Sequence, residues 1–235
     1  MKDNFPLAKS GFVMQSDCME TKWAEANLQT IRTLMERSAV YRRALAPVMI
    51  LNGVLGVTGA ISGRVLNIDS PRGFISFWGG VAFAALAGSF LLVRRQALKD
   101  AEPFWSPPTR RVTQAFLPPL VAGFVISVAV ALRLGSAQEV ELQNLGRTIS
   151  MLWLPLGWVV LYGCALHAAG FFMPRGMKIL GWAFVLSGTA LFEFGFPVGF
   201  SRIDYAYAIM GFFFGVAHLV YGVYLYFTEK GKNAA

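Results

Sequence analysis

Charged residues are scarce in this sequence. Only 14% of its 235 residues are Asp, Glu, Lys or Arg, and 55% are hydrophobic. Soluble proteins carry about 25% charged residues, which keep their surfaces hydrated. The composition therefore excludes an ordinary soluble globular domain and makes lipid the expected solvent for most of the chain.

Cysteine and histidine are also rare, with two of each. Cys18 lies in a polar segment and Cys164 in an apolar run, so we expect no disulfide between them. We find no HExxH zinc motif, no Walker loop, no GxSxG elbow and no metal-binding cluster. An enzyme is therefore disfavoured, and only Glu139, Glu141 and Asp204, which we place on the outer face, leave such a role open.

Long apolar runs dominate what is present, and each is long enough for a helix that crosses a bilayer, which needs about 17–25 residues. We predict an all-α integral membrane protein, a six-transmembrane-helix bundle. Its domains are a tail at residues 1–43, the membrane domain at 44–228 and a short tail at 229–235. The predicted spans are Leu45–Gly63, Phe74–Val93, Val112–Leu132, Ile149–Met173, Ile179–Val198 and Tyr205–Phe227.

Basic residues flank these runs unequally. With the N-terminus inside, sixteen Lys and Arg residues lie in the inner segments and five in the outer ones. This asymmetry predicts that both termini are cytoplasmic. The composition and the charge of the loops are typical of a multi-pass protein of a bacterial inner (plasma) membrane. The basic residues form no continuous stripe, so nucleic acid is not an expected partner.

A rhythm along the chain indicates three sequential helical hairpins. Basic residues precede each odd-numbered span, and a short outer connection follows it. Glycine pairs recur in the even-numbered spans, at Gly80 and Gly88, Gly163 and Gly170, and Gly215 and Gly222. Two interpretations stand: a true internal repeat, or the small residues that membrane helices use for close packing.

The segment before the first span predicts an amphipathic helix over residues 24–41. Ala24, Leu28, Ile31 and Met35 recur at helical spacing, with polar residues between them. One interpretation is an anchor on the inner membrane surface, in contact with lipids. The other is a docking helix, through which the protein forms a homo-oligomer or binds partner membrane subunits.

Ionisable residues inside the spans are the candidate ligand or proton-coupling residues, because burying them without partners is costly. Glu193 lies near the outer end of span five. It either pairs with Arg202 at the interface or acts as a proton-coupling carboxylate facing His218. Asn52, between glycines in span one, suits a hydrogen bond between helices, and a substrate contact is the alternative.

His167 and His218 lie on separate spans, as the axial ligands of haem b do. At about 1.5 Å per residue, His167 lies roughly 27 Å and His218 roughly 20 Å from the outer ends of their spans. That mismatch of about 7 Å favours histidines that hydrogen-bond to neighbouring helices. No cofactor is therefore expected, with haem b as the alternative.

Aromatic residues are abundant while buried charge is almost absent. This combination suits lipids and apolar ligands better than ion conduction. The leading hypothesis is a non-enzymatic protein that binds or transports a small ligand or lipid, or serves as a membrane subunit of a larger assembly. The alternatives are a haem-binding electron carrier using His167 and His218, and a proton-coupled transporter using Glu193.

Overall fold

The computed structural model describes most of the chain from residue 44 onward. The chain divides into two units, Met1–Ala39 and Val40–Ala235. In the first unit, Glu25, Asn27 and Leu28 are described, all helical and exposed. The predicted amphipathic helix otherwise falls outside the described residues. These are 25, 27–28, 44–99, 104–105, 107–136, 146, 148–194 and 201–233.

Six helices of the second unit are long and apolar enough to cross a membrane, and they confirm the six predicted apolar helices. The part of the chain that the structure describes contains no strand. The helices are the first span (Ala44–Val65), α2 (Pro71–Lys99), α3 (Pro107–Ser136), η1 with α5 (Ile149–Trp153, Leu154–Ala169), α6 (Arg175–Phe194), and α7, η2 and α8 (Arg202–Met210, Gly211–Val216, Ala217–Asn233).

Among the side chains that the structure describes, the charged ones of these helices lie near the two helix ends. One end, called the Arg64 end, carries Arg64, Arg72, Arg133, Glu193, Arg202 and Asp204. The opposite end, called the Arg94 end, carries Arg94, Arg95, Lys99, Arg110, Arg111, Arg175 and Lys178. The uncharged section between them is about 20 residues or longer in five of the helices, as a bilayer's hydrocarbon core requires. It is shorter in α6, where 14 residues separate Lys178 from Glu193.

Most helix boundaries differ from the sequence prediction by a few residues; the fifth span, for example, begins at Arg175 rather than Ile179. Its predicted end at Val198 lies outside the described residues. The fourth span ends at Ala169 rather than Met173, because Gly170 closes the helix and Pro174 follows. Helix α2 extends beyond its apolar run at both ends, to Pro71 and Lys99. At the C-terminal end Arg94, Arg95, Gln96 and Lys99 favour a helix, although they are polar. At the other end Pro71 occupies the first turn, where its missing N–H is not needed.

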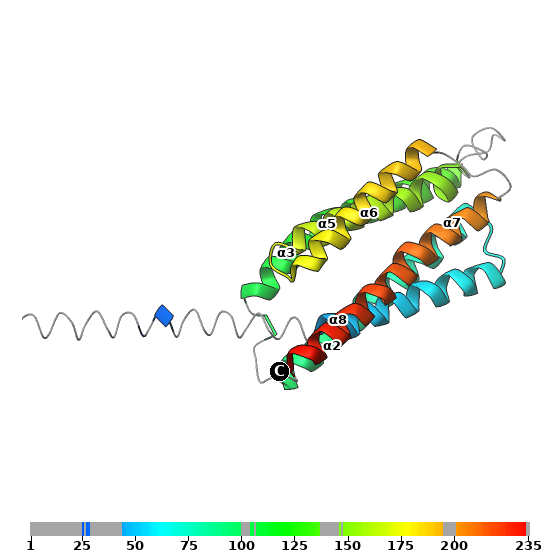
Figure 1. The fold of residues 1–235 in the computed structure, drawn as a ribbon. Helices are drawn as coiled ribbons and strands as arrows, with labels where there is room; N and C mark the ends of the chain where they lie inside the picture. Colours follow the sequence, from blue (N-terminus) through cyan, green and yellow to red (C-terminus); the bar gives the residue numbers. More distant parts are fainter. Residues whose placement is uncertain are drawn as a thin grey trace, which may run out of the picture. The chain divides into compact units, whose positions relative to one another are not determined.

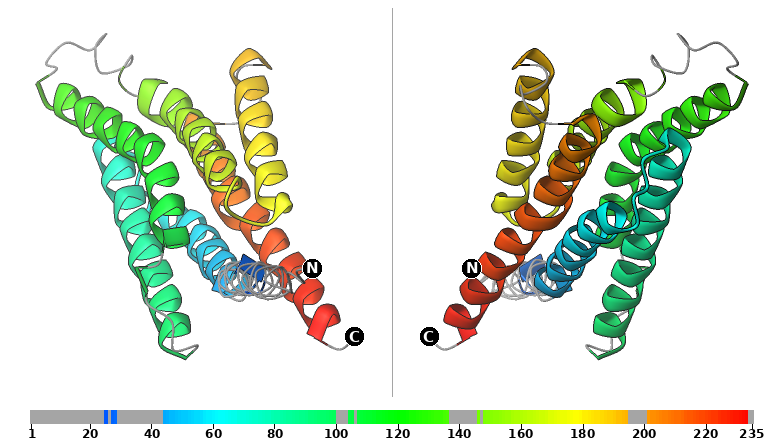
Figure 2. Two further views of the ribbon diagram at one scale, coloured as in Figure 1. Left: turned by 90° about the vertical axis from the view of Figure 1, so that its left-hand side faces the viewer. Right: turned by 90° about the vertical axis from the view of Figure 1, so that its right-hand side faces the viewer.

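Neighbouring helices in the chain contact one another. Helix α5 packs against both α3 and α6, and Figure 1 shows these three running side by side. Helix α2 contacts α3. The turned views of Figure 2 show the first span, in blue to cyan, against the continuous rod of α7, η2 and α8, in orange to red.

Glycines make the closest of these contacts. A Cβ on Gly56 would lie 2.6 Å from the backbone nitrogen of Gly215, so the first span and η2 touch through their backbones. A Cβ on Gly163 of α5 would similarly lie 2.9 Å from the carbonyl oxygen of Gly181 in α6. Gly80 of α2 has no such neighbour within 4 Å. The glycines that recur at similar spacing in the even-numbered spans therefore do not all make the same kind of helix contact.

Burial is concentrated in three of the six helices. About half of the fourth span is buried (50%), followed by the sixth (44%) and the first (39%), against 11% for α2 and 11% for α3. Most of the surface of α2 and α3 is therefore exposed and apolar, which suits contact with lipid rather than water.

Candidate functional site

Asn52 contributes to helix packing. The hydroxyl of Ser89 on α2 donates a hydrogen bond to Asn52 Oδ1, over 3.1 Å. The next residue, Gly53, packs against the backbone of Leu219 on α8. Asn52 therefore lies where the first span contacts both neighbouring helices, and its amide oxygen has a partner from within the protein.

Glu193 is exposed at the last turn of α6, at the Arg64 end. His218 packs against Phe184 of the same helix, with ring centroids 5.7 Å apart. Since Glu193 follows Phe184 by nine residues, it lies about 13 Å further along the helix axis. The structure therefore does not bring Glu193 and His218 together.

His218 is instead part of a buried polar centre with Tyr162. Its side chain is 1% exposed, and both ring nitrogens have partners. Nδ1 lies 2.8 Å from the carbonyl oxygen of Phe213, and Nε2 lies 2.9 Å from the hydroxyl of Tyr162 on α5. Because a carbonyl only accepts, Nδ1 carries the proton, and in the neutral ring Nε2 accepts from Tyr162.

Aromatic rings enclose this polar centre. Phe184 meets His218 edge-on, and Phe214 stacks on it with ring centroids 6.2 Å apart. Tyr162 contacts the same two rings, at 5.8 and 5.2 Å. Three helices thus enclose a single hydrogen-bonded pair, and the hydrogen bonds satisfy its polar atoms inside an apolar region.

The partner carbonyl belongs to a π-helical turn. In η2 the helix widens, and the backbone N–H of Ala217 bonds the carbonyl of Phe212, five residues earlier. Where such a turn returns to the α-helical pattern, the backbone ladder skips one carbonyl. Phe213 follows Phe212 at this position, and the His218 ring donates to its carbonyl. His218 therefore stabilises the π-helical turn.

His167 lies elsewhere, five residues beyond Tyr162 on α5 and so about 7 Å further along the axis. Its ring contacts Phe171 and Trp182, with centroids 5.4 and 5.2 Å away. Its Nδ1 is buried, with no hydrogen-bond partner among the described residues. The two histidines therefore occupy different levels and different aromatic surroundings.

An apolar groove opens beside the polar centre, between α6 and the α7–η2 segment. Its volume is about 470 Å³. The lining residues are Ser187, Ala190, Leu191, Phe194, Ala208, Ile209, Phe212 and Phe213. The hydroxyl of Ser187 donates to the Ala183 carbonyl of its own helix, so its proton is already used within the helix.

Phe213 connects the groove to the polar centre. Its ring lines the groove and meets Phe184 at 5.2 Å, while its carbonyl accepts from His218. The π-helical turn that His218 stabilises therefore forms one wall of the groove. In the sequence His218 stands out as an ionisable residue in an apolar run, whereas Tyr162 and the groove do not, because only the fold brings these residues together.

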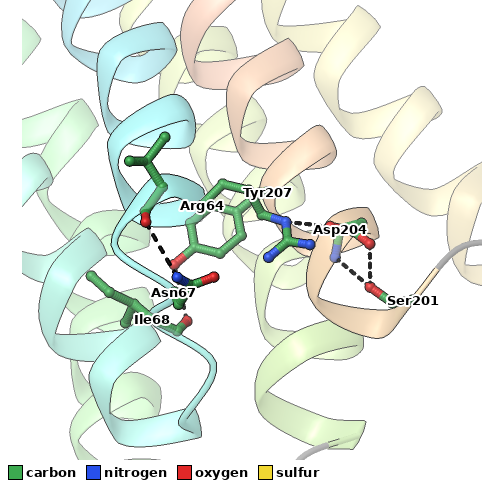
Figure 3. A network of polar contacts seen from close by, with 7 residues as sticks. Arg64, Asn67, Ile68, Ser201, Asp204 and Tyr207 are labelled. Carbon is green, nitrogen blue, oxygen red and sulfur yellow. Dashed lines mark hydrogen bonds and ion pairs between the residues drawn. The ribbon is translucent and has the colours of Figure 1, made fainter.

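A polar network also holds the first span to α7 at the Arg64 end (Figure 3). Arg64 forms an ion pair with Asp204, and the hydroxyl of Ser201 caps the backbone N–H of Asp204. The hydroxyl of Tyr207 donates to the carbonyl of Ile68 over 3.1 Å. Opposite charges at the ends of spans one and six were the available sequence signal for the ion pair.

No metal centre is evident in the described ranges, where no three His, Cys, Asp or Glu side chains cluster. Cys164 is a free, exposed cysteine. No protein-family model matches the chain, and neither a curated protein nor a solved structure is significantly similar to it.

Proposed function

We propose that the chain is a multi-pass membrane protein whose six helices form a bundle with both termini in the cytoplasm. The two charged ends, separated by an uncharged section, support insertion. The excess of basic residues at the Arg94 end supports placing that end in the cytoplasm. A plasma membrane of bacterial type is the expected location.

Within this setting the protein binds an apolar ligand, a lipid or a lipid-like molecule, in the groove between α6 and the α7–η2 segment. The observation that carries this proposal is the groove itself. Its lining is apolar, and a π-helical turn forms one of its walls. Such turns are frequent at functional sites, and maintaining this one requires a buried histidine and its tyrosine partner.

The geometry favours this function over both alternatives. Haem b would need a free nitrogen on each histidine, whereas both nitrogens of His218 have hydrogen-bond partners. A proton path would need a continuing relay, whereas the chain from Tyr162 through His218 ends on the Phe213 carbonyl, which cannot pass a proton on. Glu193 lies outside this centre, at the helix end.

Filling the groove tests the proposal. Ala208→Phe places a large ring in the groove, and Ala122→Phe places the same ring on the exposed face of α3 as a matched control. Native mass spectrometry after gentle extraction should detect a bound lipid or apolar molecule in the wild type and in Ala122→Phe, and not in Ala208→Phe. Equal ligand content in all three proteins would refute binding in the groove, and a stoichiometric second polypeptide would favour a membrane subunit.

A further inference from the structure

The apolar groove between α6 and the α7–η2 segment is closed at one end. On α6, Ser187 is the lining residue closest to the Arg94 end, and Phe184 lies three residues before it. The rings of Phe184 and Phe213 meet edge-on with centroids 5.2 Å apart, and these residues are 1% and 5% exposed. A molecule in the groove therefore cannot extend past these rings toward the Arg94 end.

The groove is open at the Arg64 end. Phe194, the last residue of α6, lines the groove and is 84% exposed. Figure 2 shows α6, in yellow, and α7, in orange, diverging toward this end. Because no charged side chain lines the groove, the polar part of an amphiphilic ligand must lie outside it. Such a ligand would place its apolar chain in the groove and its headgroup at the Arg64 end.

A cation and an anion flank the open end. Arg202 begins α7 and lies two turns, about 10 Å, before the lining residue Ile209, so both belong to the same face of that helix. Glu193 follows the lining residue Ala190 by three positions and directly precedes Phe194. Arg202 and Glu193 are exposed, and neither forms an ion pair within the described part of the chain. Each of the two helices that line the groove thus offers one unpaired charge, and the two charges are of opposite sign.

We propose that the groove binds one acyl chain of a phospholipid whose headgroup is phosphoethanolamine. The phosphate accepts hydrogen bonds from the Arg202 guanidinium, and the primary ammonium donates to the Glu193 carboxylate. Phosphocholine carries the same two charges, but its quaternary ammonium has no N–H to donate. The inference rests on the proposed function and adds to it the class of the lipid and its orientation in the groove.

Lipid titration of the delipidated full chain in detergent micelles tests the headgroup contacts, with native mass spectrometry as the readout. Phosphatidylethanolamine and phosphatidylcholine are compared with identical acyl chains, so that only the headgroup differs. The wild type should bind phosphatidylethanolamine about threefold more tightly. Glu193→Gln should abolish this preference by weakening phosphatidylethanolamine alone, and Arg202→Gln should weaken both lipids about threefold, because both carry the phosphate.

Matched controls remove one charge of each sign at the same end, at positions that do not line the groove. These are Asp69→Asn and Arg72→Gln, and both should bind the two lipids as the wild type does. Equal affinity of the wild type for the two lipids, or a preference that Glu193→Gln retains, would overturn the ammonium contact. Equal weakening by Arg72→Gln and Arg202→Gln would replace the phosphate contact with general attraction.

Ala208→Phe separates failure of the headgroup contacts from failure of the groove. If this variant loses both lipids while Glu193→Gln and Arg202→Gln bind them as the wild type does, the headgroup proposal is wrong and binding in the groove stands. If Ala208→Phe retains both lipids, the groove is not the binding site, and the proposed function and the headgroup proposal both fail.

Discussion

The ring of His218 donates from Nδ1 to the carbonyl oxygen of Phe213, five residues earlier in the same helix, over 2.8 Å. Phe213 also lines the apolar groove. One hydrogen bond thus connects a buried polar centre to the shape of an apolar groove. Because His218 is buried, water cannot replace this bond, and we expect the helix geometry at Phe213 to depend on His218.

Removing His218 should destabilise the protein. His218→Ala leaves a cavity and deprives the Tyr162 hydroxyl and the Phe213 carbonyl of their partners, so we expect a loss of about 3 kcal/mol in the free energy of unfolding. The free energy of unfolding can be measured in bicelles by titration with a denaturing detergent. In a double-mutant cycle with Tyr162→Phe, the loss in the double variant should be smaller than the sum of the two single losses, because the two groups act together.

Strict additivity of the two losses would contradict the contact between His218 and Tyr162. The control is Tyr226→Phe, which changes an exposed ring of the same helix.

The contact between the first span and η2 should not tolerate a methyl group. In Gly56→Ala the added carbon would lie 2.6 Å from the backbone nitrogen of Gly215, and both backbones would have to separate. We expect a loss of about 1–3 kcal/mol in the free energy of unfolding. Gly80→Ala is the matched control, since no atom lies within 4 Å of its added carbon. Equal stability of the two variants would disprove the backbone contact.

The ion pair between Arg64 and Asp204 should contribute little and depend on salt. Their side chains are 44% and 38% exposed, so solvent and ions screen the attraction. A double-mutant cycle with Arg64→Gln and Asp204→Asn should give a small favourable coupling at low salt that diminishes as salt is raised. Coupling that is large and indifferent to salt would show instead that lipid shields the pair.

The orientation can be read from cysteine labelling in intact cells. In a background of Cys18→Ser and Cys164→Ser, Asp69→Cys at the Arg64 end should react with a membrane-impermeant maleimide. Trp105→Cys at the Arg94 end should react only after the membrane is permeabilised. The reverse pattern would invert the topology. Equal behaviour of the two positions in intact cells, both labelled or both protected, would place the two ends on the same side and refute helices that cross between them.

The sequence predicted the six apolar helices because each is a long run without charge, and such a run is a local property. It did not predict the π-helical turn at Gly211–Val216, which depends on a histidine contact that only the folded helix offers. The glycines of span two resembled those of spans four and six in spacing, yet Gly80 meets no neighbour. Which face of a membrane helix packs is decided by its partners, and hydropathy does not distinguish a lipid-facing apolar residue from a buried one.

The candidate site was predicted only in part for the same reason. His218 stood out as an ionisable residue in an apolar span, whereas Tyr162 looked like one aromatic among many. The lining of the groove comes from α6 and from the α7–η2 segment. No sequence motif indicates that these two segments lie together. A sequence indicates which polar residues are costly to bury, and the fold decides which partner offsets that cost.

The backbone contact between the first span and η2 also constrains how the protein is made. Ribosomes synthesise the first span well before its partner, so Gly53 and Gly56 emerge with no helix to receive them. The first span must therefore remain undocked through the synthesis of the next four helices. Assembly of this protein is therefore completed by its last helix, and a chain that stops short of η2 leaves its first helix without its closest partner.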